Sequence, residues 1–262
     1  MTRVPHYVSR GEGPPIVLLH GIGGLHAVWR RQLDALSERH RVVAWDMPGY
    51  GGEGIDEPMT FAGLAAGLGA LLDDLGGTPV HLVGHSMGGM VAQEFAVAGQ
   101  DRLASLTLFA TSPSFGRPDG DFQKKFVADR LRPLDDGKGM KGVADGAAMA
   151  GLIGPLAEAG ALEAVRACMA RVPEAGYRAA VRCITTFERR EALAAIAVPT
   201  LLIAGEVDPN APPPMMERMA AKIPGARYAC MADTGHFGNL ERADEFNALL
   251  GGFIEQTPAP RP

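Results

Sequence analysis

The sequence has no long apolar run, and its first residues, MTRVPHYVSRGEGPP, contain no apolar segment of the kind found in secretory signal peptides. No stretch approaches the roughly 20 consecutive apolar residues that a transmembrane helix needs. Cysteine is also scarce: the 262 residues include only Cys168, Cys183 and Cys230, without the CxxC spacing of a metal site. We therefore expect small buried thiols, a cytoplasmic and reducing compartment, and no membrane partner.

An excess of positive charge is absent as well. The net charge is −5, and no Lys/Arg run is longer than two residues. The sequence thus offers no basic face for a phosphate backbone, and we expect no nucleic-acid partner. What the chain does have is apolar residues: at 47% of the composition, they suffice for the core of a large α/β domain.

Short apolar runs alternate with stretches in which apolar residues recur every three or four positions. The apolar runs predict strands at 14–21, 41–49, 79–86, 103–110, 199–208 and 226–233, and the spaced stretches predict helices at 60–76, 87–99 and 212–225. This alternation predicts an α/β fold with a mostly parallel sheet and helices on both faces. Residues 112–190 lack strand signals, so we expect them to form a helical cap inserted into a core of 1–111 and 191–262.

The motif VGHSMGG, at 83–89, places Ser86 between a predicted strand and a predicted helix. Some hydrolytic enzymes carry their serine nucleophile on such a sharp turn between a strand and a helix. Glycines two residues before and after the serine then leave room for the crossing backbone. Gly84 and Gly88 have the required spacing. Ser86 is therefore the candidate nucleophile.

A serine nucleophile needs a base and an acid, which on such a sheet follow it in the order acid, then histidine. His236 is the only histidine after Ser86, so elimination makes it the base. Asp208 ends the predicted strand 199–208 and is favoured as the acid because it lies furthest out at the sheet edge. Glu206, two residues earlier, remains the alternative.

An oxyanion hole needs two backbone N–H donors. Met87, directly after the nucleophile, supplies one at the start of its helix. The glycine-bearing loop LLHGIGG, at 18–24, supplies the other, for which we favour the N–H of Ile22. We expect His20 in the same loop to be structural.

Five segments in this order, HGIGG (20–24), DMPGYGGEG (46–54), GHSMGG (84–89), GEVD (205–208) and TGHF (234–237), resemble the α/β-hydrolase superfamily. The resemblance implies a sheet of up to eight strands, a Ser86–Asp208–His236 triad, oxyanion donors at Ile22 and Met87, and neither metal nor other cofactor.

The second half is similar to 3-oxoadipate enol-lactonases and related small-ester hydrolases, through VPEAGYRAAVRCI (172–184), ALAAIAVPTLLIAGEVDPNAPP (192–213) and Met87. It differs from them in His85 before the serine and in a cap without tryptophan. The expected activity is hydrolysis of a small carboxylic ester or lactone. A carbon–carbon bond hydrolase and a non-catalytic small-molecule receptor are the alternatives.

The predicted cap is the basic part of an acidic chain. Residues 112–190 contain 13 Lys/Arg and 10 Asp/Glu, a balance of +3. This asymmetry favours an anionic small-molecule substrate under the cap, because a guanidinium suits a carboxylate. The candidate anchors are Arg130, Arg166, Arg171 and Arg182.

Overall fold

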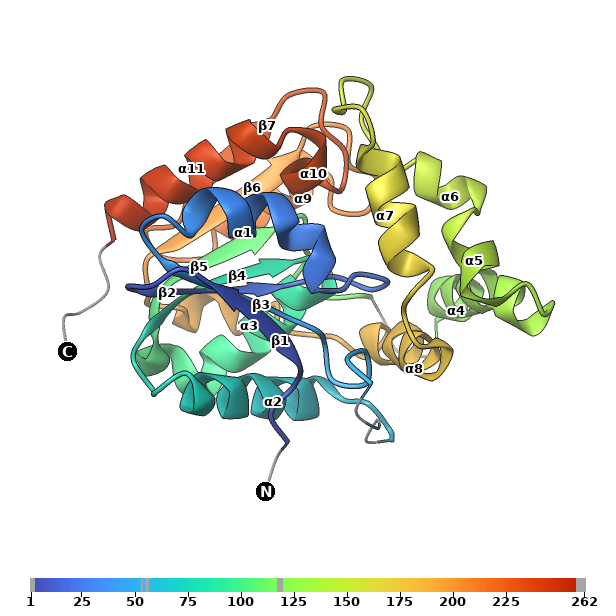
Figure 1. The fold of residues 1–262 in the computed structure, drawn as a ribbon, viewed down its shortest axis with the longest axis horizontal. Coiled ribbons are helices and arrows are strands. Elements are labelled where there is room, and N and C mark those ends of the chain that lie inside the picture. The colour runs from blue at the N-terminus through green and yellow to red at the C-terminus, as the bar shows by residue number, and fades with distance from the viewer. Residues whose placement is uncertain (1–2, 53, 55–56, 117–119, 258–262) are drawn as a thin grey trace.

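The computed structural model describes residues 3–257, apart from 53, 55–56 and 117–119 (Figure 1). Seven strands form one sheet in the order β1-β3-β2-β4-β5-β6-β7. All neighbouring pairs are parallel except β1 with β3. The strands are β1 (Tyr7–Arg10), β2 (Pro15–Leu19), β3 (Arg41–Trp45), β4 (Val80–His85), β5 (Leu103–Phe109), β6 (Thr200–Gly205) and β7 (Arg227–Met231).

The six strands predicted from apolar runs are present, and the predicted mostly parallel sheet is confirmed. The sequence analysis missed β1. This strand is four residues long and lies at the edge of the sheet, with none of its side chains fully buried. An edge strand of this kind needs no apolar run, so the sequence carries no signal for it.

Helices cover both faces of the sheet, as predicted. In Figure 1, α1 and α11 lie above the strands and α2 and α3 lie below them. The helix α2 begins after Thr60, whose hydroxyl accepts a hydrogen bond of 3.1 Å from the Gly63 N–H and so satisfies one free donor of the first turn. The core helices are η1 (His26–Trp29), α1 (Arg30–Leu36), α2 (Phe61–Asp74), α3 (Met87–Gly99), η2 (Gln100–Arg102), η3 (Leu193–Ala195), α9 (Pro213–Ala220), α10 (Gly238–Glu241) and α11 (Ala243–Glu255).

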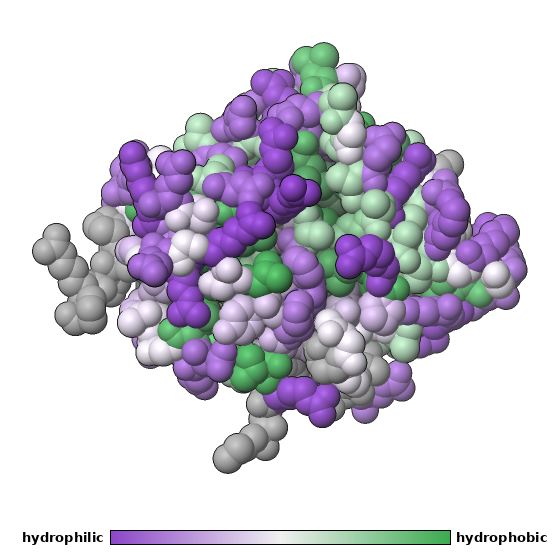
Figure 2. Space-filling model, viewed as in Figure 1, coloured by the Kyte–Doolittle hydropathy of each residue, from purple (hydrophilic) through white to green (hydrophobic). Residues whose placement is uncertain are grey.

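Residues 112–190, which we call the cap segment, form a group of helices beside the sheet, on the right in Figure 1. Hydrophilic residues dominate the face in Figure 2, with apolar residues among them where these helices meet the rest of the chain. The helices are α4 (Asp121–Asp135), α5 (Gly139–Ala144), α6 (Ala147–Ala150), α7 (Ala161–Met169) and α8 (Glu174–Ile184).

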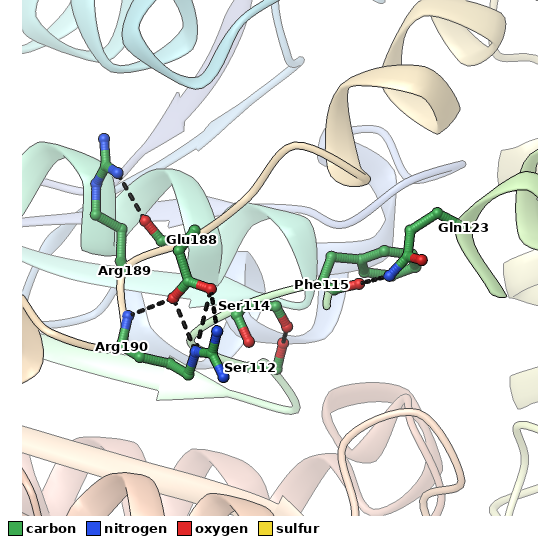
Figure 3. Close-up of polar contacts among 7 residues, drawn as sticks. All are labelled: Ser112, Ser114, Phe115, Gln123, Glu188, Arg189 and Arg190. Atoms are coloured by element: carbon green, nitrogen blue, oxygen red, sulfur yellow. Dashed lines mark hydrogen bonds and ion pairs between the residues drawn. The ribbon is translucent and has the colours of Figure 1, made fainter. Parts of the chain in front are cut away.

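The chain enters and leaves the cap segment through two stretches that lie side by side (Figure 3). Ser114 and Glu188 form an isolated antiparallel bridge. The Phe115 N–H donates to the Phe187 carbonyl at 3.0 Å, next to this bridge. Glu188 is in turn held by an ion pair of 2.6 Å with Arg190. The two crossings therefore form a short two-stranded neck.

Cys168 and Cys183 are buried, as expected, but the expectation for Cys230 was wrong: this thiol is exposed. Cys230 lies on β7, an edge strand on which only Met231 is fully buried. In the part of the chain that the structure describes, no helix combines the length and apolarity needed to cross a membrane.

The turn between β4 and α3 requires close backbone packing. A Cβ at Gly84 would lie 2.5 Å from the carbonyl oxygen of Gly88. A Cβ at Gly88 would lie 2.4 Å from the carbonyl oxygen of Leu19 on β2. No side chain fits at these distances unless the backbone moves, so both glycines let α3 follow β4 closely.

Replacing Gly88 by alanine should therefore destabilise the protein. We expect Gly88→Ala to lower the free energy of unfolding by about 1–3 kcal/mol, the usual range for overpacking, as measured by urea denaturation. The control is Gly251→Ala in α11, where the new Cβ would meet no atom within 4 Å. This control should gain about 0.5–1 kcal/mol, and equal stability of the two variants would contradict the packing argument.

Candidate active site

A cavity of about 450 Å³ lies between the core and the cap segment. Core residues that line it include Ser86 after β4 and His236 after β7, and the cap segment contributes Phe115, Arg130 and Leu152. A cavity of this size suits a small molecule. The carboxyl ends of parallel strands are the usual ligand-binding edge of an α/β sheet, and Ser86 and His236 both follow such ends.

Ser86 occupies the strained turn that the motif predicts. Its φ of 53° and ψ of −118° place a non-glycine residue in a sparsely populated region of positive φ, a conformation that costs about 1–3 kcal/mol and persists only where the surroundings impose it. The Ser86 N–H donates to the Phe109 carbonyl at 2.9 Å, and the Ser86 carbonyl accepts from the Thr111 hydroxyl at 2.7 Å. These bonds hold the backbone of the turn while the residue lines the cavity.

Asp208 and His236 form a buried pair, of which His236 lines the cavity. The Nδ1 atom of His236 lies 2.7 Å from Oδ2 of Asp208, and the two side chains are 6% and 0% exposed. Burial by itself raises the pKa of Asp208, but attraction and hydrogen bonding from His236, together with the N–H groups of Asn210 and Ala211, outweigh it and keep the pKa below its usual value. Asp208 is therefore a carboxylate that lies within hydrogen-bonding distance of the imidazole Nδ1.

Glu206, the alternative acid, points elsewhere. Its side chain accepts a hydrogen bond of 2.8 Å from the backbone N–H of Asp233 and is exposed. The strand β6 ends at Gly205, and a turn closed by the Asp208 N–H and the Gly205 carbonyl at 3.2 Å follows. This turn separates the directions of Glu206 and Asp208 and brings only Asp208 to His236.

The backbone of His236 is fixed from two sides. Its N–H donates to the carbonyl of Leu152 in the cap segment at 2.7 Å. Its carbonyl accepts from Nε2 of His85 at 2.8 Å, and burial lowers the pKa of His85 to about 3. His85 is thus neutral with its proton on Nε2. The residue before the serine, which the sequence analysis noted only as a difference from the lactonases, acts here as a support for His236.

Glu241 supports the loop 232–237 that carries His236, which we call the histidine loop. Its fully buried carboxylate accepts three backbone hydrogen bonds: from Gly154 and Gly235 on Oε2, both at 2.8 Å, and from Phe237 on Oε1 at 2.9 Å. Gly235 and Phe237 flank His236, and Gly154 belongs to the cap segment. One carboxylate therefore joins the histidine loop to the cap segment.

The loop after β2 lies directly against Ser86. A Cβ at Gly21 would lie 2.8 Å from the Cβ of Ser86, and Ile22 lines the cavity. His20 is buried and holds this loop, since its Nδ1 donates to the Gly21 carbonyl at 2.8 Å and its Nε2 accepts from the Met47 N–H at 2.9 Å. Burial lowers the pKa of His20 to about 4, so it is neutral and structural, as expected.

The four cap arginines do not share one location. Arg130 on α4 lines the cavity, and its guanidinium carbon lies 5.4 Å from the centre of the Phe126 ring. Arg171 and Arg182 are exposed, and neither these two nor the half-buried Arg166 lines the cavity. Helical spacing alone did not reveal which face of each cap helix turns inward.

The residues that could hold a metal lie elsewhere. Among the described histidines, cysteines and acids, one group has suitable geometry: His6, His26 and Asp46. None of these three lines the cavity.

A family model described as the alpha/beta hydrolase fold matches residues 14–243. The chain belongs to the α/β-hydrolase family. The matched region includes every residue of the two loops and the turn described above. Relatives that are named as hydrolases identify this chain as a hydrolase of the family.

Individual relatives cover nearly the whole chain. A protein of Azorhizobium caulinodans that carries the provisional name carbamate hydrolase RutD is 32% identical, over 95% of this chain and 94% of its own length. The 3-oxoadipate enol-lactonase 1 of Acinetobacter baylyi is 27% identical, over 93% and 90%. The crystal structure of the enol-lactonase from Burkholderia xenovorans LB400 superposes with a TM-score of 0.84 at 28% identity, covering 95% of this chain and 96% of that one. The chain is thus an α/β-hydrolase similar to proteins named as a carbamate hydrolase and as enol-lactonases.

Substitution of Glu241 tests whether its hydrogen bonds stabilise the histidine loop. We expect Glu241→Gln to lower the free energy of unfolding by about 1–3 kcal/mol, since an amide group, whichever way it is turned, leaves at least one buried N–H without an acceptor. Urea denaturation measures the change. Glu245→Gln is the matched control, because Glu245 makes a partly exposed ion pair of 2.9 Å with Arg242 and should change stability by less than about 0.5 kcal/mol. A loss in Glu241→Gln no larger than in the control would disprove the role.

Proposed function

We propose that this hydrolase cleaves small carboxylic esters or lactones with Ser86 as nucleophile, His236 as base and Asp208 as the orienting acid. The observation that supports this most is the 2.7 Å pair of His236 and Asp208, both nearly fully buried, with Ser86 and His236 lining one cavity. A carboxylate bonded to Nδ1 leaves Nε2 of the imidazole to accept a proton.

The reaction then follows from these positions. The Ser86 hydroxyl attacks the carbonyl carbon and passes its proton to Nε2 of His236, while Asp208 stabilises the imidazolium. The carbonyl oxygen takes the negative charge between the N–H groups of Ile22 and Met87, the latter being a free donor in the first turn of α3. The imidazolium returns its proton to the leaving alcohol. A water molecule attacks the acyl-enzyme by the same route and releases the acid and Ser86.

The cavity supports a substrate with an apolar body and one anionic group. Most of the lining is apolar, including Phe115, Phe126 and Leu152. Arg130 is the only lysine, arginine, aspartate or glutamate among the described residues that line it. We infer that Arg130 binds a carboxylate of the substrate while the carbonyl to be attacked lies at Ser86.

Substitutions at the two acids test the triad. With a p-nitrophenyl ester as substrate, we expect Ser86→Ala to lower kcat by about six orders of magnitude and Asp208→Asn by about four. Glu206→Gln is the control and should stay within about threefold, because its side chain contacts a backbone N–H away from His236. A larger loss in Glu206→Gln than in Asp208→Asn would show that the acid is misassigned.

A fluorophosphonate probe separates an enzyme from a receptor on the same fold. The probe should label the wild-type protein at Ser86, located by mass spectrometry of the peptides, and should not label Ser86→Ala. An unlabelled wild-type protein would favour the receptor.

Arg130→Gln tests the anionic part of the substrate. We expect this variant to lose about tenfold or more in kcat/KM for an anionic lactone, since a charged hydrogen bond contributes about 1.5–3 kcal/mol, and to keep its activity on neutral esters. The wild-type preference for the anion should weaken as salt screens the pair. Arg182→Gln is the control, because Arg182 is exposed and lies outside the cavity. An unchanged ratio of anionic to neutral activity in Arg130→Gln would refute the assignment.

A further inference from the structure

Three residues far apart in the chain meet at the edge of the sheet, outside the cavity. His6 precedes β1, Asp46 follows β3 and His26 begins η1. The antiparallel pairing of β1 with β3 places His6 opposite Asp46, whose N–H donates to the His6 carbonyl at 2.8 Å. The loop after β2 brings His26 to the same carboxylate.

The side-chain atoms of the three residues converge. Nδ1 of His6 lies 2.7 Å, and Nδ1 of His26 lies 2.9 Å, from the same Oδ2 atom of Asp46. One ligand atom from each residue can be chosen so that all lie within 4.8 Å of one another. Oδ1 of Asp46 also accepts the backbone N–H of His26 at 2.6 Å, which fixes the orientation of the carboxylate.

The surroundings leave the group open on one side. The Asp46 side chain is 5% exposed, but those of His26 and His6 are 27% and 48% exposed, so solvent reaches the imidazoles. An ion can therefore approach the two imidazoles from solvent, with the buried carboxylate of Asp46 behind them.

We propose that His6, His26 and Asp46 form a binding site for one divalent transition-metal ion of the zinc type. Two imidazole nitrogens and a carboxylate oxygen suit Zn²⁺, whereas Mg²⁺ and Ca²⁺ require oxygen ligands. Tetrahedral ligands at bond lengths of about 2.0–2.1 Å lie about 3.3 Å apart. Each nitrogen therefore has to move away from Oδ2 by about 0.5 Å, and the ligand atoms, which start within 4.8 Å of one another, have to settle at that common spacing. Water fills the remaining position.

Metal binding changes which nitrogen of each imidazole carries the proton, not the number of protons. In the structure each Nδ1 is positioned to donate its proton to Asp46. With the metal bound, each imidazole carries its single proton on Nε2 and directs the Nδ1 lone pair to the ion. The ion replaces two hydrogen bonds, and no net proton is released from neutral histidines.

A bound ion stabilises the part of the chain around the three ligands. The ion ties the segment before β1 to the start of η1, which directly follows the loop 20–24 beside Ser86. An ion that binds only the folded chain raises its stability by mass action.

Calorimetric titration and thermal unfolding of the chelator-treated full chain test the site. We expect Zn²⁺ to bind in a 1:1 ratio and, at about a hundredfold excess over its Kd, to raise Tm by about 5 °C or more, whereas Mg²⁺ should do neither. His6→Gln and His26→Gln should each weaken Zn²⁺ binding at least tenfold. His6 is half-exposed, so its variant should fold even if the other does not.

Three controls locate the ion. His40→Gln removes a histidine outside the group, Cys230→Ser removes the exposed thiol, and Ser86→Ala alters the cavity, and all three should bind Zn²⁺ as the wild type does. Absence of saturable binding, or binding that survives His6→Gln and His26→Gln, would overturn the proposal and leave the group as a hydrogen-bonded cluster. The outcome is independent of the proposed esterase activity.

Discussion

The structure depends on how closely α3 follows β4. The turn at Ser86 forces a non-glycine residue to a positive φ, and the backbones on either side approach to distances that only glycine permits. Gly84 and Gly88 lie at such approaches, and Gly21 lies where a Cβ would be only 2.8 Å from the Cβ of Ser86. The loop after β2 consequently lies against Ser86 without any direct bond between their side chains. The position of the serine is thus determined by backbone packing in the most buried strands of the sheet.

The histidine loop is built in the opposite way, by polar contacts. His236 is bonded through its N–H to Leu152, through its carbonyl to His85, and through its side chain to Asp208. Glu241 holds the residues on either side. Since Leu152 belongs to the cap segment, this part of the cap is a structural support of the site.

Much of the sheet and of the candidate site could be predicted from the sequence, because some structural features leave a pattern in it. Buried parallel strands produce apolar runs, and the turn at Ser86 needs glycines at fixed spacing, so both leave clear patterns. Chain order identified His236. Asp208 was favoured over Glu206 on position alone, and the turn after Gly205 that separates them is not visible in the sequence.

The remaining features leave no pattern because their partners are backbone groups or are distant in the chain. Glu241 accepts three backbone N–H groups and, among the residues that the structure describes, has no side-chain partner that spacing could reveal. His6 meets Asp46 only through the pairing of β1, a short edge strand. Arg130 could not be distinguished from the other cap arginines, because helical periodicity defines faces without saying which one turns inward.

The two-stranded neck at Ser114 and Glu188 has a consequence for how this fold diversifies. Because the entry and exit of the cap segment are adjacent, the residues between them form an insertion whose two ends lie side by side. A replacement of different length or helix number can be inserted there without stretching the sheet beneath. Such a graft must still present one carbonyl and one N–H where Leu152 and Gly154 now meet His236 and Glu241. The insert must also bring an apolar face to the sheet, because Val165, Met169 and Val181 of the cap segment belong to the same buried cluster as the strands.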